Sequence, residues 1–173
     1  MAIGEPEFRR LIETHQRMVF SLALRITGDY STAEEVAQDV FLALHRDGER
    51  LNGEDHIRYW LRRVAVHRAT DALRRKSVRP EATAEEWLEE QQYDGVAPSS
   101  VALQARLEEL LRALPEPMRV AVLLRYQEEL LPDEIAAVLS QPVGTVKSNL
   151  QRGLKLLRRK AAVIMKEYVR ETA

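Results

Sequence analysis

Apolar residues recur every three or four positions along almost the whole chain, and no run alternates apolar and polar residues as a half-buried strand would. This spacing places the apolar side chains of each segment on one face of a helix. It predicts three helices in the first half, at about 7–26, from residue 31, and at about 55–76. Four more are predicted at about 100–114, 117–127, 132–139 and 142–166. We therefore predict an all-α protein made of two helical halves.

Local signals mark where these helices begin and end. Gly28 is a typical C-cap for the first helix. The sequence "STAE" that follows matches a capping box, in which Ser31 accepts from the helix amides and Glu34 reaches back. Gly48 and Gly53 indicate a loop over residues 47–56. The acidic, proline-bounded residues 80–98 are typical of a linker, which divides the chain into residues 1–79 and 99–173.

Charge is segregated along the chain, although the formal net charge is only −1. Residues 58–79 hold eight Lys or Arg against the single acid Asp71, and the next Asp and Glu residues follow with no base among them. A second basic block lies between residues 147 and 160. Two positive blocks favour a polyanionic partner bound at two places. Solvated helix faces on either side of a polar linker would give the same composition, so both interpretations stay open here.

Residues 132–159 have the pattern of a helix-turn-helix, with a short helix, a turn of about three residues and a longer basic helix. On the second helix one outward face carries Thr145, Ser148, Asn149 and Arg152, and a flanking stripe includes Lys147 and Lys155. Short polar side chains near a helix N-terminus can contact the edges of nucleobases in the major groove, and surrounding Lys and Arg side chains can contact phosphates. These six residues are our candidate DNA contacts in the second half.

Other classes of protein find little support in the composition. Cysteine is absent, which excludes disulfides and thiolate metal sites. The four His residues lack paired metal spacing, and no phosphate-binding glycine loop occurs. No apolar run is long enough to span a bilayer, and the N-terminus lacks the layout of a secretory signal. We therefore expect a cytoplasmic protein that is not an enzyme, needs no cofactor or metal, and has no membrane partner.

Three segments, taken in order, resemble bacterial RNA polymerase sigma factors of the extracytoplasmic-function subfamily. They are "GDYSTAEEVAQDVFLALHR", "YWLRRVAVHRATDALRRK" and "LPEPMRVAVLLRYQEELLPDEIAAVLSQPVGTVKSNLQRGLKLLRR". The resemblance covers about residues 7–162. It implies that residues 1–79 form sigma region 2, that 80–98 are the linker, and that 99–173 form sigma region 4. The implied partners are core RNA polymerase and promoter DNA, and an anti-sigma protein is plausible.

The resemblance also implies roles for individual residues. In the second helix, the surface that binds the clamp helices of the largest polymerase subunit would consist of Glu35, Gln38, Asp39, Leu42 and Arg46. The loop 47–56 would capture a flipped base of the −10 element, at a cost of a few kcal/mol in unstacking. The third helix would bind and melt the −10 element through Arg62, Arg63, His67, Arg68, Arg74 and Arg75. The C-terminal helix-turn-helix would bind the −35 element.

Some positions depart from the family pattern. Ser140 and Glu129 stand where relatives usually have Gly, and a left-handed backbone at Ser140 would bring strain of roughly 1 kcal/mol. Asn149 stands where Arg is common, and His67 where Asn is common, so the promoter preference of relatives does not transfer. An alternative hypothesis is a transcriptional regulator that binds duplex DNA through the C-terminal helix-turn-helix without polymerase.

Overall fold

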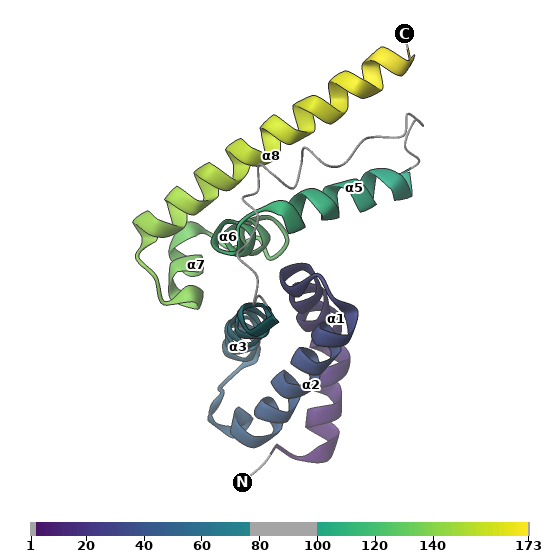
Figure 1. The fold of residues 1–173 in the computed structure, drawn as a ribbon. Helices are drawn as coiled ribbons and strands as arrows, with labels where there is room; N and C mark the ends of the chain where they lie inside the picture. Colours follow the sequence, from purple (N-terminus) through teal and green to yellow (C-terminus); the bar gives the residue numbers. More distant parts are fainter. Residues whose placement is uncertain (1–2, 77–99, 173) are drawn as a thin grey trace. The chain divides into compact units, whose positions relative to one another are not determined.

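The computed structural model describes residues 3–76 and 100–172. Within these ranges the chain forms seven α-helices and one short 3-10 helix, and no strand (Figure 1). The prediction of an all-α protein is confirmed. The predicted acidic linker at 80–98 lies outside the described residues. None of the described helices is both long and apolar enough to cross a membrane.

The chain divides into two compact units. In the first unit α1 (Glu5–Thr27), α2 (Tyr30–Asp47) and α3 (Glu54–Lys76) pack against one another, and residues 133–141 are grouped with them. The grouped segment holds nearly all of α7 (Pro132–Leu139), where the Tyr59 hydroxyl donates to the carbonyl oxygen of Ala137 at 3.1 Å. In the second unit α6 (Glu116–Tyr126) packs on α8 (Val143–Thr172), and α5 (Ser100–Ala113) also contacts α8.

The first unit has a core of aliphatic side chains from its three long helices. Leu22, Ile26, Leu44 and Leu61 are fully buried. His15 is also buried in this unit, where burial and the nearby Arg58 lower the pKa of its imidazole. The ring is therefore neutral at physiological pH. This core holds the outer sides of α2 and α3 in fixed positions.

The ends of α1 and α2 meet at a tight turn. Gly28 adopts a left-handed conformation with φ of 70° and donates its backbone N–H to Leu24, as the sequence predicted for a C-cap. The next residue, Asp29, is the N-cap of α2, and its carboxylate accepts the backbone N–H of Thr32 at 2.9 Å. The predicted capping box with Ser31 and Glu34 is therefore wrong. Because α1 stops at Gly28, α2 begins as soon as the chain leaves the turn, and its N-cap, Asp29, lies two residues before the predicted cap, Ser31.

The second unit contains a close helix–helix approach and a buried arginine. A Cβ on Gly153 of α8 would lie 3.1 Å from Cγ2 of Val122 and 3.3 Å from Cβ of Met118, so glycine lets α6 and α8 come together here. Arg119 of α6 is buried, and its guanidinium donates to the carbonyl oxygens of Arg112 at 2.7 Å and Leu114 at 2.9 Å. These are orphan carbonyls at the C-terminal end of α5, which this side chain satisfies.

Candidate nucleic-acid interface

The N-terminal half of α8 has a buried side and an exposed side. Val146, Leu150 and Gly153 are buried, and they follow one another at helical spacing. Thr145, Lys147, Arg152 and Lys155 are exposed, and Ser148 and Asn149 are half-buried. All six predicted DNA contacts therefore lie outside the buried stripe of this helix. They are available to a partner that approaches α8 from its exposed side.

The turn before α8 brings the backbone into an uncommon conformation. Ser140 has a φ of 53°, in the left-handed region that residues other than glycine rarely adopt. The N–H groups of Ser140 and Gln141 donate to the carbonyls of Ala137 and Ala136, which closes the end of α7. The carbonyl of Pro142 then accepts the N–H of Thr145 at 3.0 Å and starts α8. The three residues 140–142 thus form the short connection that the sequence predicted.

Gly144 lies at the exposed tip of α8. A Cβ on this residue would have nothing within 4 Å, so no contact with another described residue requires glycine at this position. A small residue here gives a partner close access to the backbone of the first helical turn. This observation leaves Gly144 without a packing role among the described residues.

The basic residues predicted on α3 do not form one uniform surface. Ile57, Leu61, Ala65, Val66, Ala69 and Thr70 make up the buried side of the helix. Arg63, His67, Arg74 and Arg75 are exposed, and Arg62 and Arg68 are half-buried. Nε2 of His67 lies 3.3 Å from the carbonyl oxygen of Val138. All six lie outside the buried side, but Arg68 and His67 already contact other helices.

The predicted polymerase-binding residues share the outer side of α2. Glu35, Gln38, Asp39, Leu42 and Arg46 are all exposed, and the side chain of Leu42 is 67% exposed, which is unusual for leucine. Arg46 donates two hydrogen bonds to the carboxylate of Asp47, at 3.2 and 3.0 Å. These bonds raise the pKa of Arg46 and lower the pKa of Asp47. The side chain of Leu42 is thus available for burial against a protein partner.

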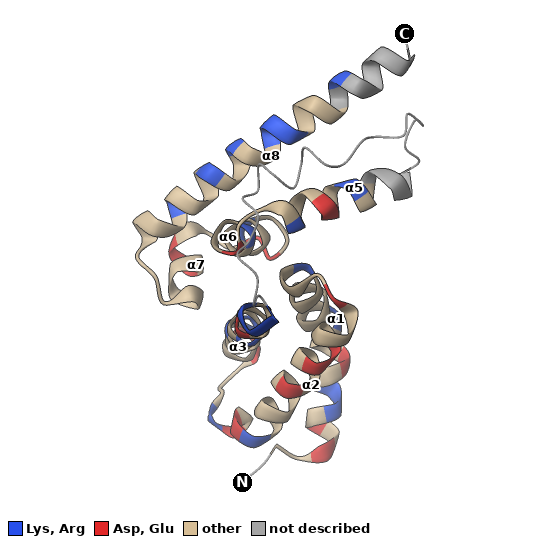
Figure 2. Cartoon of the chain, in the orientation of Figure 1, with Lys and Arg blue, Asp and Glu red and all other residues tan. Residues whose placement is uncertain are grey.

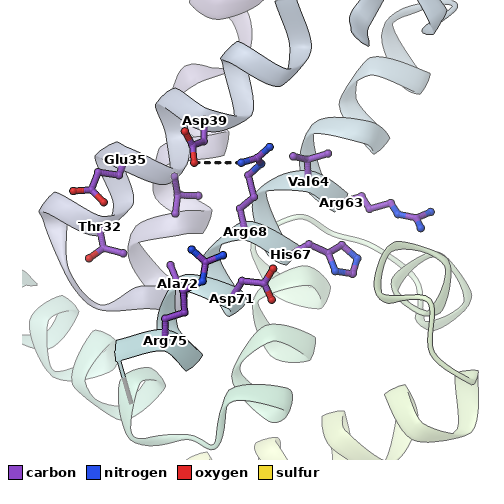
Figure 3. A pocket seen from close by; sticks show the side chains of 11 residues that line it. Thr32, Glu35, Asp39, Arg63, Val64, His67, Arg68, Asp71, Ala72 and Arg75 are labelled. Atoms are coloured by element: carbon purple, nitrogen blue, oxygen red, sulfur yellow. Dashed lines mark hydrogen bonds and ion pairs between the residues drawn. The ribbon is translucent and has the colours of Figure 1, made fainter. Parts of the chain in front are cut away.

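A groove of about 430 Å³ separates the outer sides of α2 and α3 (Figure 3). Acidic side chains line it from both helices, namely Glu35, Asp39 and Asp71, and basic side chains from α3, namely Arg63, Arg68 and Arg75. Across the groove Arg68 donates to Asp39 at 3.2 Å, as the dashed line in Figure 3 shows. This ion pair joins one residue predicted to bind polymerase to another predicted to bind DNA. Nothing in the sequence indicated it, because the partners are 29 positions apart.

Lys76 is a further residue that the sequence analysis did not single out. It lies in the last turn of α3, and its ammonium donates to the carboxylate of Asp29 at 3.0 Å. Hydrogen bonds from Thr32 first, and then from Lys76, lower the pKa of Asp29 to about 2. Lys76 therefore fastens the C-terminal end of the basic helix to the N-terminal end of α2. Because Lys76 follows other basic residues in the sequence, this contact between helices could not be predicted from the sequence.

The loop between α2 and α3 is partly ordered by helical turns. Residues Gly48–Arg50 form the 3-10 helix, and Gly53 has a φ of 85°. The backbone N–H of Asn52 donates to Nδ1 of His56 at 3.3 Å. Asn52 and His56 are both exposed. The loop thus presents polar groups to solvent on a backbone that is held at its base.

The described residues offer no alternative site for metal chemistry, since no group of three or more His, Asp or Glu side chains among them could hold a metal ion.

Comparisons with known proteins match both halves of the chain. The family model for sigma-70 region 2 matches residues 11–79, and the model for sigma-70 region 4 matches residues 104–157. The chain is 28% identical over 163 residues to the ECF RNA polymerase sigma factor SigW of Bacillus subtilis, which covers 88% of this chain and 87% of the relative. It is 27% identical over 172 residues to the ECF RNA polymerase sigma-E factor of Escherichia coli, which covers 92% and 88%.

Solved structures show the same fold. The sigma factor RpoE of Bartonella quintana, solved in complex with the anti-sigma factor NepR, superposes with a TM-score of 0.69 at 15% identity and covers 91% of this chain and 98% of its own. CnrH, solved in complex with the cytosolic domain of CnrY, gives a TM-score of 0.66 at 20% identity and covers 93% and 91%. At these identities the likeness concerns the fold. Matches in both halves do not favour the alternative of a regulator that uses only its C-terminal helix-turn-helix.

Proposed function

The chain belongs to the extracytoplasmic-function subfamily of the sigma-70 family, and we infer from this membership that it directs core RNA polymerase to its promoters. It binds the core enzyme and promoter DNA and acts in transcription initiation. The observation that carries this conclusion is the presence of both region 2 and region 4, in that order, on one chain. Sigma factors are not enzymes as a class, and we propose that this chain likewise leaves the polymerisation chemistry to the core. Its place of action would be the cytoplasm, with the polymerase.

We propose that the functional division of the chain follows the family regions, with residues 1–79, the linker 80–98 and residues 99–173. The gap between the two family matches, from 80 to 103, supports this division. The region 4 match includes α7 and the turn at Ser140 as well as α6 and most of α8. The range of this match therefore includes residues 132–157 of the segment 132–159 that the sequence predicted to form the helix-turn-helix.

The exposed side of α8 would read the −35 element. Thr145, Ser148, Asn149 and Arg152 would face base edges, and Lys147 and Lys155 would contact phosphates. The support is their position outside the buried stripe and the open space around Gly144. Asn and Arg can each make two hydrogen bonds to one base, worth about 1–3 kcal/mol of discrimination.

The exposed side of α3 would bind the −10 element as it melts. Its basic residues can contact the backbone of the separated strand, a contribution that does not depend on sequence. The loop after α2 would receive the flipped base, and Asn52 and His56 are its exposed polar groups. The candidate residues of α3 are Arg62, Arg63, His67, Arg68, Arg74 and Arg75.

The outer side of α2 would bind the clamp helices of the largest polymerase subunit. The exposed Leu42 supports this proposal, because burial of such a side chain against a partner contributes about 1.5–3 kcal/mol. Glu35, Gln38, Asp39 and Arg46 surround it with polar groups that can pair across an interface. Two solved structures of similar fold are complexes, one of the sigma factor RpoE with the anti-sigma factor NepR and one of CnrH with the cytosolic domain of CnrY. We propose that an anti-sigma protein also regulates this chain.

Run-off transcription with purified core enzyme tests the proposal. We expect the chain to stimulate transcription from a subset of genomic fragments, and sequencing of the opened promoters would identify the elements that it reads. Arg152→Ala should weaken promoter binding by about 10- to 100-fold with normal affinity for core. Asp39→Ala should instead lower the affinity for core. Absence of both core binding and stimulation would refute the function, and equal effects of the two variants on DNA binding would refute the assignment of residues.

A further inference from the structure

Helix α8 is much longer than the part that the family match covers. It runs from Val143 to Thr172, 30 residues, whereas the region 4 match ends at residue 157. At about 1.5 Å per residue the whole helix is about 45 Å long. The last 15 residues therefore form an arm that continues the recognition helix without a break.

The described part of this arm is basic, and no ion pair with another described residue neutralises its charges. Between Val143 and Lys166 the sequence has seven Lys or Arg residues and no Asp or Glu (Figure 2). Arg158, Arg159 and Lys166 are exposed. Among the residues that the structure describes, no acidic side chain forms an ion pair with them. An arm of this kind repels other cations and attracts an anionic surface.

The basic side chains continue the line of the predicted recognition face. Successive residues of an α-helix are about 100° apart around its axis, so Arg152, Lys155, Arg159 and Lys166 fall within about 60° of one another. Ser148, in the recognition face, lies in the middle of this sector. Lys160, in contrast, points about 100° away from Arg159, and it is half-buried. The face of α8 that would contact nucleobase edges near the N-terminus thus carries a row of Lys and Arg side chains toward the C-terminus.

The shape of DNA explains what such a row would meet. The major groove winds around the duplex, whereas α8 continues as one helix for about 45 Å, so only its first turns fit between the two backbones. The rest of the helix leaves the groove across a sugar–phosphate strand. Its side chains on the DNA side are then next to phosphates rather than bases.

We propose that Arg159 and Lys166, with Arg158 beside them, bind DNA phosphates that adjoin the −35 element. The proposal rests on the proposed function, since it requires that α8 lies in the groove. It adds a sequence-independent contact beyond the residues of the family match. Each phosphate that a side chain neutralises releases counterions and steepens the fall of affinity with salt by about 0.9 in the log–log slope.

The test uses the full-length chain and a 30-base-pair duplex of mixed sequence, since phosphate contacts do not require the correct promoter. Affinity is measured by fluorescence anisotropy between 50 and 200 mM KCl. We expect Arg159→Gln/Lys166→Gln to reduce the salt slope by about 1.8, so that the wild type loses about 12-fold more affinity than the variant over this range. The matched control Arg17→Gln/Lys160→Gln removes the same charge from α1 and from another side of α8, and it should keep the wild-type slope.

Three outcomes would overturn the inference: equal slopes in wild type and variant, an equal loss of slope in the control, or no measurable duplex binding by the wild type. Circular dichroism of both variants shows whether α8 remains helical. Run-off transcription separates this result from the proposed function. If the variant keeps the wild-type salt slope and the chain still opens promoters with core enzyme, the proposed binding of phosphates by the arm is refuted and the proposed function is not.

Discussion

Two residues other than glycine adopt left-handed backbone conformations at the ends of helices in the region 4 segment. Glu129 has a φ of 57° after α6, and Ser140 has a φ of 53° after α7. These are the two positions at which the family resemblance led us to expect glycine. The sequence analysis predicted strain at Ser140 if its backbone were left-handed, and the structure confirms that conformation. The chain therefore tolerates a steric cost at both junctions.

Ser140→Gly should stabilise the protein by about 1 kcal/mol. Glycine adopts a positive φ without the clash of a Cβ, and this gain exceeds the entropy that glycine adds to the unfolded chain. Urea unfolding followed by circular dichroism measures the change. Ser140→Ala serves as control, because alanine keeps the Cβ and should give no gain. A Gly variant no more stable than the Ala variant would contradict the assignment of strain.

Asp29 should make the stability of the first unit depend on acid. Its pKa is lowered from 3.8 to about 2 by hydrogen bonds from Thr32 and Lys76. A carboxylate whose pKa is lower in the folded state stabilises that state above its unfolded pKa, and the contribution disappears as the pH falls through the folded value. We expect the wild type to be more stable than Asp29→Asn at pH 5, with a difference that shrinks between about pH 4 and pH 2.

Urea unfolding at several pH values measures that difference. Asn remains a good N-cap, so the comparison isolates the charge of Asp29 rather than the loss of the cap. Glu34→Gln removes a carboxylate from the exposed side of the same helix and controls for net charge. A gap between wild type and Asp29→Asn that stays constant from pH 5 to pH 2 would show that the charge of Asp29 does not stabilise the folded first unit.

At the scale of helices, the sequence predicted which helices exist and in which order, but it predicted their first and last residues less accurately. The bounds of α7 match the prediction at both ends, because Pro132 is favourable in the first turn and a turn follows Leu139. The end of α8 is six residues beyond the prediction, since no Gly or Pro follows Gly153 to stop it. The start of α2 was missed because Ser31 and Asp29 are both good caps, and only the position of the Gly28 turn decides between them.

The contacts that join helices could not be predicted in the same way. Arg119 was an ordinary basic residue in the sequence, and only the fold brings it to the carbonyls at the end of α5. The pair Arg68–Asp39 and the contact of Lys76 with Asp29 likewise join residues far apart in the chain. The candidate residues of α8 were predicted because they share a face of one helix, whereas those of α2 and α3 were implied by the family resemblance. Residues that act between helices have no such spacing.

Arg119→Met should destabilise the second unit by about 3 kcal/mol or more. Methionine fills a similar volume but cannot donate, which leaves the carbonyls of Arg112 and Leu114 without their buried partner. Hydrogen bonds to charged groups contribute about 1.5–3 kcal/mol each. Arg112→Met is the matched control, because that side chain is exposed and its backbone carbonyl remains. Equal stability of the two variants in urea unfolding would show that Arg119 does not cap α5.

At the scale of the whole molecule, nearly balanced charge conceals a separation of surfaces. The formal net charge of −1 combines a basic α3 and a basic α8 with acidic groups elsewhere (Figure 2). The basic helices therefore need not repel a negatively charged partner such as DNA, although the chain as a whole is not basic. Within the first unit the two kinds of surface are adjacent. The acidic groups of α2 and the basic groups of α3 line opposite sides of one groove (Figure 3). Polymerase and DNA would therefore be bound by neighbouring residues. The ion pair between Asp39 and Arg68 would compete with the binding of Asp39 to polymerase and of Arg68 to DNA.

This arrangement predicts opposite effects of one substitution on the two partners. Asp39→Asn should weaken binding of the full-length chain to core polymerase and strengthen its binding to a single-stranded oligonucleotide, because Arg68 loses its ion pair. An exposed pair contributes about 0.2–1 kcal/mol, so the gain in DNA affinity should lie between about 1.4- and 5-fold. Glu35→Gln removes the same charge from the same groove without touching that ion pair, and its effect on DNA should be smaller. If both variants gain equally, net charge alone accounts for the change; if Arg68→Gln leaves the difference between them intact, the pair does not link the two surfaces.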